Sequence, residues 1–492
     1  MSSSKSIFKT SLITGGSQMM VMAMNMVRTK VLAVLLGPGG TGIIGLYSTT
    51  TDLFNTISGL GLTNSAVKQI AASNAEVNKE AIQKTLFVYR WLIRITTITA
   101  AICMFLFAKS ISQYTFGTTN NSYGIKWMSL VVLFTGMSNG QMALLQGLRR
   151  IKDLAMARML GAFIGSLVCI TLIFFFRKEG IIPFLIGGAA TTLLLSWLFT
   201  QKAKIPSLKV DLKDFKMKTI SLLTMGFAFL ISGLTGSLSG YYSRILISKS
   251  FSIKDLGLYT ASWTLSAIYV NFILTAMGAD FYPRLSGTIH DNEKSNKLVN
   301  EQTKIGIAMA ITGIIAVVSF SPIILRIFYS QHFSEAWRLL QWMTLGMAIK
   351  VISWPLGYII IAKGKAKIFI FLEVSWGVIY VSLLYFFTKW FGLEGAGIAF
   401  FVTYGVNCLF VWIAASILTG FSWNFDVKKQ IIWLLIAAIF VFISSRVLLP
   451  NWQYTVNTLV FLIVVFFAYK NMETILGTSL IDIFLKKIGY KK

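Results

Sequence analysis

The chain has 492 residues, of which 55% are hydrophobic, 14% aromatic and 13% charged, and its mean hydropathy is +0.71. This composition excludes a soluble globular domain and is typical of an integral membrane protein. The formal net charge of +27 comes from Lys and Arg residues dispersed over many short loops, so it does not indicate nucleic-acid binding.

Apolar stretches of the roughly 20 residues that a helix needs to cross a bilayer recur along the whole chain. We expect about fourteen transmembrane helices, the first of which is an uncleaved span rather than a signal peptide. The first six are predicted at residues 11–36, 42–72, 84–108, 124–147, 154–176 and 181–200. After a basic segment at 201–218, further helices are predicted at 219–248, 256–283, 305–328, 335–362, 367–388, 393–418, 430–449 and 454–470.

Short internal matches indicate two related halves. Gly45-Leu46-Tyr47 recurs as Gly257-Leu258-Tyr259, a shift of 212, and Glu179-Gly180 recurs as Glu394-Gly395, a shift of 215. Six spans return the chain to the starting side of the membrane, so the halves share one orientation. We therefore predict an all-α polytopic membrane protein with two six-helix bundles, residues 1–217 and 218–420, related by pseudo-twofold symmetry. Residues 421–492 are expected to add a helix pair and a basic cytoplasmic tail.

The loop charges also predict an orientation. Most Lys and Arg residues of the loops fall on one side of the predicted spans, and translocation disfavours carrying positive charge across the membrane. Both termini are therefore expected on the cytoplasmic side.

Polar residues at helical spacing mark spans one, two, seven and eight, which occupy equivalent places in the two halves. A helix that faces only lipid should be apolar all round, so these stripes predict the walls of a cavity. Hydroxyl stripes also occur as packing contacts between membrane helices, but that alternative does not explain charged groups. The stripe residues used below are Gln18, Asn25 and Arg28 in span one, Asp52 and Asn55 in span two, and Asp280 in span eight; the charged group of span seven is Arg244.

Several charged groups lie deep in the predicted spans. A cation at the bilayer centre costs about 2.5 to 3.5 kcal/mol, so such groups must face protein or water. Asp52, Arg94 and Lys350 are the deepest, and Arg28, Lys30 and Arg244 are intermediate in depth. Arg158 and Glu373 hold equivalent positions in the halves and are either cavity groups or structural ion-pair partners. Cations closer to predicted ends are read as interfacial anchors; they are Arg90, Lys126, Arg326, Arg338 and Arg446.

The sequence offers no metal or acid–base site. Cys103, Cys169 and Cys408 all lie in apolar helices, where they are expected to be small buried side chains. The two histidines, His290 and His332, lie in separate loops. An interior with more cations than acids instead indicates an anionic ligand.

Four segments carry a family resemblance: residues 30–47, KVLAVLLGPGGTGIIGLY; residues 281–285, FYPRL; residues 361–364, IAKG; and residues 371–374, FLEV. They resemble Wzx-type flippases, the translocases of O-antigen and enterobacterial common antigen in the multidrug/oligosaccharidyl-lipid/polysaccharide exporter superfamily. The resemblance covers roughly residues 7–418. It departs at the C-terminus. Many Wzx proteins resemble twelve-helix chains, whereas this chain is expected to add two helices.

The resemblance implies a transporter, not an enzyme, in the bacterial inner membrane, with a MATE-like fold. Its expected cargo is an undecaprenyl-pyrophosphate-linked oligosaccharide, moved from the cytoplasmic to the periplasmic leaflet by alternating access. No cofactor is expected. Coupling of transport to protons or sodium is left open. An association with a polysaccharide polymerase or with assembly proteins is also left open. The expected pyrophosphate contacts are Arg28, Lys30, Arg94 and Arg244. The expected polar or coupling groups of the cavity are Gln18, Asn25, Asp52, Asn55, Asp280, Lys350 and Glu373.

Other functions remain as alternatives. A MATE-type cation-coupled multidrug exporter would share the fold, but a cationic cargo prefers acidic walls. A membrane-embedded polysaccharide polymerase or glycosyltransferase would need a sizeable extramembrane loop, whereas the longest expected outer loop spans only residues 109–123. A non-transporting member of a polysaccharide assembly machinery would leave the membrane-embedded cations unexplained.

Overall fold

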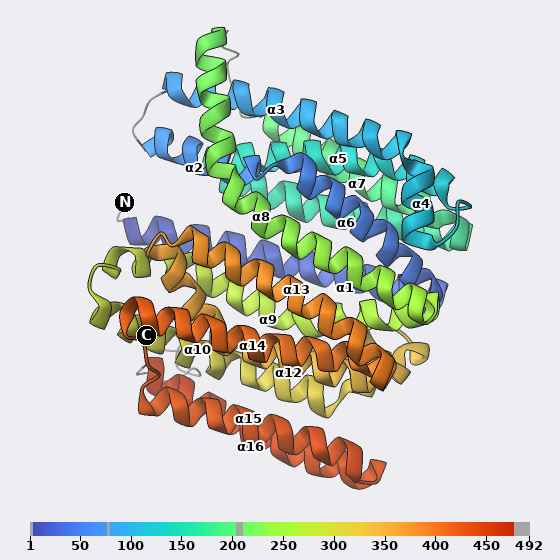
Figure 1. Cartoon of the computed structure of the whole chain (residues 1–492), viewed down its shortest axis with the longest axis vertical. Coiled ribbons are helices and arrows are strands. Elements are labelled where there is room, and N and C mark those ends of the chain that lie inside the picture. Colours follow the sequence, from blue (N-terminus) through green and yellow to red (C-terminus); the bar gives the residue numbers. More distant parts are fainter. Residues whose placement is uncertain (1–2, 76–78, 203–209, 477–492) are drawn as a thin grey trace, which may run out of the picture. The chain divides into compact units, whose positions relative to one another are not determined.

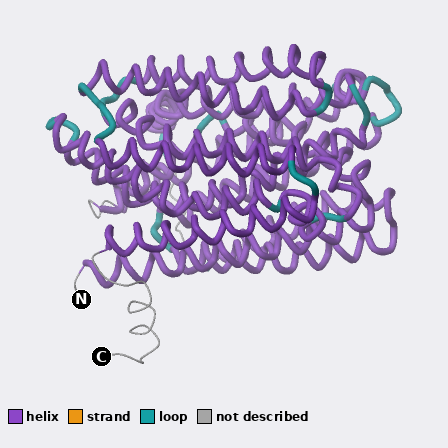
Figure 2. Tube along the Cα trace, turned by 90° about the horizontal axis from the view of Figure 1, so that it is seen from below, coloured by secondary structure: helices purple, strands orange, loops and turns teal. Residues whose placement is uncertain are grey.

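A computed structural model of the chain describes residues 3–75, 79–202 and 210–476. Within these ranges the chain is almost entirely helical and has no strand, and short loops join the helices (Figure 2). The all-helical prediction is therefore confirmed. The predicted basic C-terminal tail falls on residues 477–492, which lie outside the described residues, as does part of the basic segment 201–218.

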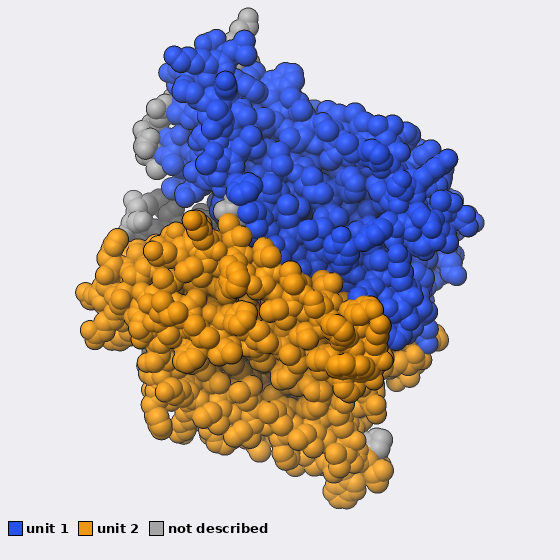
Figure 3. Space-filling view, viewed as in Figure 1, with its two compact units in different colours: residues 1–257, 328–330 blue, residues 258–327, 331–492 orange. Residues whose placement is uncertain are grey.

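The chain forms two compact units, which Figure 3 colours separately. Unit 1 comprises Met1–Gly257 and Phe328–Ser330, and unit 2 comprises Leu258–Ile327 and Gln331–Lys492. This division falls after α8, not at 217/218, because α8 packs on α1, α2 and α3. The two related sequence halves stay a prediction.

Unit 1 contains α1 (Ser3–Gly59), α2 (Leu62–Ala75), α3 (Lys79–Leu106), α4 (Ala108–Phe116), α5 (Ser122–Gly147), α6 (Ile151–Phe176), η1 (Arg177–Gly180), α7 (Ile181–Gln201) and α8 (Leu212–Ser250). Unit 2 contains most of α9 (Ile253–Thr288) and of α11 (Ser321–Phe328), together with α10 (Asn292–Ser319), η2 (Gln331–Ala336), α12 (Trp337–Ala362), α13 (Ala366–Phe391), α14 (Glu394–Thr419), α15 (Phe425–Val447) and α16 (Pro450–Leu476).

The described residues include 11 helical segments that are long and apolar enough to cross a membrane, or 12 if the bent α8 counts as one span. Two of these segments, Gly15–Gly59 and Ile151–Gln201, have 45 and 51 residues. Each is more than twice the roughly 20 residues that one crossing needs. A polytopic membrane protein is therefore confirmed, while the number fourteen stays a prediction.

A break in α1 separates the first two predicted spans. Gly37 has φ +65°, a left-handed conformation that glycine adopts without steric cost, and Pro38 follows it. The ribbon turns back at this point (Figure 1). A Cβ atom on Gly257 would lie 1.8 Å from the carbonyl oxygen of Pro38, and one on Gly42 would lie 2.2 Å from that of Ile253. Glycine at both positions therefore lets the start of α9 pack directly on the break.

The second predicted span, 42–72, is not continuous. Helix α1 ends at Gly59 and α2 begins at Leu62, and Gly61 between them has φ +66°. A Cβ atom on Gly61 would lie 2.0 Å from the carbonyl oxygen of Gly226, so this turn also sits against the backbone of α8. Gly59 and Gly61 therefore lie at an interruption between the two helices.

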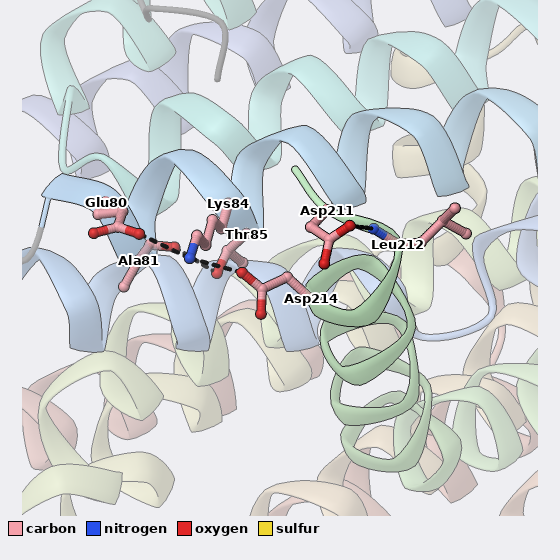
Figure 4. Close-up of polar contacts among 7 residues, drawn as sticks. All are labelled: Glu80, Ala81, Lys84, Thr85, Asp211, Leu212 and Asp214. Carbon is pink, nitrogen blue, oxygen red and sulfur yellow. Dashed lines mark hydrogen bonds and ion pairs between the residues drawn. The ribbon is translucent and has the colours of Figure 1, made fainter. Parts of the chain in front are cut away.

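The start of α8 is held by a charged contact with α3 (Figure 4). The Lys84 ammonium lies 2.7 Å from a carboxylate oxygen of Glu80 and 2.7 Å from one of Asp214. One residue before α8, the carboxylate of Asp211 accepts a hydrogen bond of 2.8 Å from the backbone N–H of Leu212. These contacts fix where α8 begins and therefore how its later turns meet α1.

The two C-terminal helices attach to unit 2 through α10 and α12, and a carboxylate at the start of α14 joins them to the bundle. Glu394 accepts a hydrogen bond of 2.8 Å from the indole of Trp342 and lies 2.6 Å from a guanidinium nitrogen of Arg446 on α15. The Arg446 guanidinium also lies over the ring of Phe442, 4.2 Å from its centroid. Arg446 is therefore an ion-pair partner in the helix packing rather than only the interfacial anchor that the sequence suggested.

We expect Glu394→Gln to destabilise the protein by about 2 kcal/mol, because it leaves the partly buried Arg446 without its counter-charge. Thermal unfolding of the purified protein in detergent measures the effect as a lowered Tm. Asp280→Asn is the matched control, since it removes a carboxylate from an exposed ion pair and should leave Tm nearly unchanged. Equal Tm values for wild type and Glu394→Gln would contradict this role of Glu394.

Candidate functional site

Helices α1 and α8 form a close antiparallel pair within unit 1. The hydroxyls of Thr56 and Ser237 are 2.7 Å apart, and Ser65 on α2 donates a hydrogen bond of 2.8 Å to the carbonyl oxygen of Leu222. Later positions on α1 and α2 therefore meet earlier positions on α8. Small residues on α8 make this approach feasible: a Cβ on Gly233 would lie only 3.2 Å from the Thr56 side chain.

This pairing brings Asp52 and Arg244 together. Asp52 is one turn before Thr56, so it comes opposite the segment of α8 that follows Ser237, where Arg244 lies. The positive charge of Arg244 acts on the Asp52 carboxylate. The Asp52 side chain is exposed and that of Arg244 is half-buried. Both groups lie in segments of membrane-spanning length and composition, so this accessible carboxylate and guanidinium form the core of the candidate site.

Most hydrogen-bonding capacity of Arg244 is unused within the described residues. One terminal nitrogen donates a hydrogen bond of 3.1 Å to the carbonyl oxygen of Gly240, and the buried Nε has no partner among them. A guanidinium carries five N–H donors in a planar fork that matches phosphate oxygens. The buried side-chain carbonyl oxygen of Asn55, three residues after Asp52, likewise has no described hydrogen-bond partner. The site therefore offers both donors and an acceptor to a polar ligand.

Arg28 approaches α6 rather than α8. Its side chain reaches the thiol of buried Cys169, and it is half-buried. Arg28 lies nine residues before Gly37, whereas Asp52 lies fifteen residues after it. Because the chain turns back at Gly37, the two residues differ in depth by about 9 Å at the helical rise of 1.5 Å per residue. The helical rise thus places Arg28 about 9 Å from the level of Asp52, and no described contact joins Arg28 to Arg244.

The remaining predicted residues of the first span are Gln18, Asn25 and Lys30. All three are half-buried on the part of α1 that precedes the break. Gln18 and Asn25 stay predicted cavity residues, and Lys30 stays a predicted pyrophosphate contact.

Arg94 lies elsewhere in unit 1. Together with Arg90 it lines a cavity of about 880 Å³ between α3, α5 and α7, here called the arginine pocket. None of the residues that line this pocket comes from α1 or α8. The structure therefore does not bring Arg94 together with Arg28 and Arg244. It also shows that Arg90 lines a cavity, whereas the sequence suggested an interfacial anchor.

In unit 2 the structure brings two of the predicted residues together. The Lys350 ammonium donates a hydrogen bond of 3.0 Å to the side-chain carbonyl of Asn271 and lies 6.0 Å from the ring centroid of Tyr404. It also interacts electrostatically with Glu373 on α13. The sequence did not identify Asn271 or Tyr404. An amide such as Asn271, isolated in an otherwise apolar stretch, is the signal that could have found it.

Asp280 lies on α9, which runs from Ile253 to Thr288, and stays a predicted cavity residue. Its side chain is 76% exposed and pairs with Arg284 one turn further along, at 3.2 Å. Asp280 is therefore one partner of an exposed ion pair.

Within residues 3–75, 79–202 and 210–476, no three His, Cys, Asp or Glu residues come together as a metal site would require.

Comparison with known proteins identifies the family. The profile of a family described as polysaccharide biosynthesis protein matches residues 31–338, more than half of the chain. The chain belongs to the polysaccharide biosynthesis protein family. This membership confirms the resemblance carried by the motif around Gly37. The matched range includes Asp52, Arg94 and Arg244, but not Arg28 or Lys30.

A relative and two solved structures extend this result. The chain is 24% identical to the lipid III flippase of Escherichia coli K12 over 416 residues, 81% of this chain and 95% of that protein. The lipid II flippase MurJ in an inward closed conformation aligns with a TM-score of 0.69 at 14% identity, over 94% of this chain and 98% of its own. An inward-facing MATE family multidrug transporter aligns with a TM-score of 0.69 at 17% identity, over 82% of this chain and 96% of its own. This member of the polysaccharide biosynthesis protein family thus has the fold of the MATE transporter and MurJ, and the MurJ match covers more of the chain.

Proposed function

We propose that the protein is a flippase that moves a polyprenyl-pyrophosphate-linked oligosaccharide from the cytoplasmic to the periplasmic leaflet of the bacterial inner membrane. The family and the relation to a lipid III flippase over 95% of that protein support this function. The observation that carries it is Arg244, a cation within the membrane-spanning part whose donors are largely free of described partners.

The chemistry of such a cargo suits this site. A pyrophosphate carries two or more negative charges, and its charge-assisted hydrogen bonds to a guanidinium are stronger in a low-dielectric surrounding than in water. Arg244 and Arg28 would bind the pyrophosphate, while the sugars occupy hydrated space and the polyprenyl chain stays in lipid. Opening of the site first to one side of the membrane and then to the other would complete the transfer.

Asp52 is the residue that we propose for coupling. A carboxylate beside the substrate-binding cation can interact with Arg244 when the substrate is absent and take up a proton or a sodium ion when the anionic substrate engages Arg244. Transport would then depend on the gradient of that ion.

The charge of the site separates this function from multidrug export, although MATE exporters share the fold. A cationic drug would be repelled by Arg28 and Arg244, and Asp52 is the carboxylate that the described part of the chain places near Arg244. The likeness to MurJ also covers 94% of the chain against 82% for the exporter.

Complementation tests the proposed function. In a strain that lacks its own lipid-linked oligosaccharide flippase, expression of this chain with its matching glycosyltransferases should restore surface polysaccharide. Variant Arg284→Ala, which changes an exposed ion pair, should restore it equally well. Continued accumulation of the lipid-linked oligosaccharide in the cytoplasmic leaflet, with the protein present in the membrane, would overturn the proposal.

A further inference from the structure

The arginine pocket is separate from the candidate transport site and has its own charge. Its volume is about 880 Å³, and Arg90 and Arg94 lie one turn apart on α3, so they share one face of that helix. Gly140 of α5 forms part of the floor, and a Cβ atom added there would meet the Ile93 side chain at 3.2 Å. Because Gly140 has no side chain, the pocket extends further in between the flanking helices at this position.

The charges in this pocket are not balanced by the described protein. No described residue forms an ion pair, a hydrogen bond or a cation–π contact with the side chain of Arg90 or Arg94. The two guanidinium groups repel each other. Like charges one turn apart destabilise a helix, and the cost rises where the surroundings are apolar. An anion between the arginines would remove this repulsion.

A further donor borders the same space. The side-chain carbonyl of Gln141, which lines the pocket, accepts a hydrogen bond of 2.5 Å from the hydroxyl of Ser196. The amide NH₂ of Gln141 is thereby left as a donor beside the arginines. Two guanidinium groups and an amide form a set of donors suited to phosphate oxygens.

The rim of the pocket has the character of a lipid-facing surface. Leu194 and Trp197 of α7 line it and are 56% and 45% exposed, and Trp91 of α3, beside Arg90, is 47% exposed. Exposed side chains of this size on membrane-spanning helices contact acyl chains. Side chains on a helix lean toward its N-terminus, so both arginines point toward the end where α3 begins. Thr200 and Gln201, the last residues of α7, line that end of the pocket.

We propose that the arginine pocket binds the headgroup phosphate of an anionic phospholipid from the surrounding bilayer. The acyl chains lie over the exposed apolar rim, and Arg90, Arg94 and Gln141 hold the phosphate. A zwitterionic lipid fits less well, because its own cationic group would approach two arginines. This lipid is a bound constituent of the folded protein and not the transported substrate.

Native mass spectrometry of the full-length protein, titrated with phosphatidylglycerol or phosphatidylcholine, tests the proposal. Wild type should retain phosphatidylglycerol in preference to phosphatidylcholine. The double variant Arg90→Gln/Arg94→Gln should bind phosphatidylglycerol at least about tenfold more weakly, as expected for the loss of two charged hydrogen-bond donors. The matched control is Lys126→Gln, another membrane cation, which lies over the Phe105 ring outside the pocket and should change nothing.

Several results would overturn the proposal. They are equal retention of both lipids by wild type, unchanged phosphatidylglycerol binding by the double variant, and displacement of the lipid by an equal concentration of inorganic phosphate or of a polyprenyl pyrophosphate. Should the double variant fail to fold, a photoactivatable phosphatidylglycerol can be cross-linked to the unaltered protein and the adducts mapped by peptide. Adducts are expected on residues 89–94 and 193–201, and their absence there would overturn the proposal equally.

Discussion

Substitution Arg244→Ala is expected to reduce transport of the lipid-linked oligosaccharide at least about a hundredfold, with the protein still present in the membrane. The guanidinium is the donor-rich group beside Asp52, and each charged hydrogen bond to a pyrophosphate is worth about 1.5 to 3 kcal/mol. Loss of two such bonds corresponds to a factor of roughly a hundred or more. Surface polysaccharide in the complementation strain, normalised to the amount of membrane-inserted protein, measures the effect.

Two further variants sharpen this result. Arg244→Lys keeps the charge but loses the planar fork, so it should retain part of the activity. Arg284→Ala removes a cation from an exposed ion pair and should retain all of it. Full activity of Arg244→Ala would remove Arg244 from the proposed binding site.

The second large effect concerns the Asp52–Arg244 pair. We expect Arg244→Ala to lower the thermal stability of the protein, because the Asp52 carboxylate, which lies in a segment of membrane-spanning composition, loses the nearby positive charge. Adding Asp52→Asn removes the uncompensated charge, so the double variant Asp52→Asn/Arg244→Ala should recover the lost stability. It should not recover transport, because the proposed pyrophosphate contact is still missing.

A double-mutant cycle measures both quantities on the same four proteins: Tm in detergent and transport in inverted membrane vesicles. The Asp280–Arg284 pair supplies the control cycle, in which the exposed charges should show little coupling in either quantity. If the double variant recovers transport together with stability, Arg244 acts only as a counter-charge for Asp52, and the proposed substrate contact is wrong.

The sequence alone predicted the local structure wherever glycine residues or apolar composition determine it. The apolar stretches predicted the helices closely, and the glycine-rich segment after Leu36 predicted the break between the first two spans. These features depend on residues near one another in the chain, so the local pattern carries them.

The sequence could not supply the side-chain neighbours. Asp52 and Arg244 were each recognised as unusual, but their pairing depends on how Thr56 meets Ser237, a tertiary contact. Arg90 was read as an interfacial anchor from its distance to a predicted helix end, and the cavity that it lines depends on how α3, α5 and α7 pack together. Arg94 was recognised as deep, yet depth alone does not reveal which face of α3 borders a cavity.

The central claim is that Arg28 and Arg244 bind the pyrophosphate of a polyprenyl-linked substrate. Equilibrium binding to the purified protein in nanodiscs tests it most directly, with undecaprenyl pyrophosphate, undecaprenyl monophosphate and undecaprenol as ligands. We predict that affinity falls in that order and that Arg28→Ala/Arg244→Ala abolishes the difference between them. Equal affinity of wild type for the uncharged alcohol, or an unchanged preference for pyrophosphate in the double variant, would contradict the account.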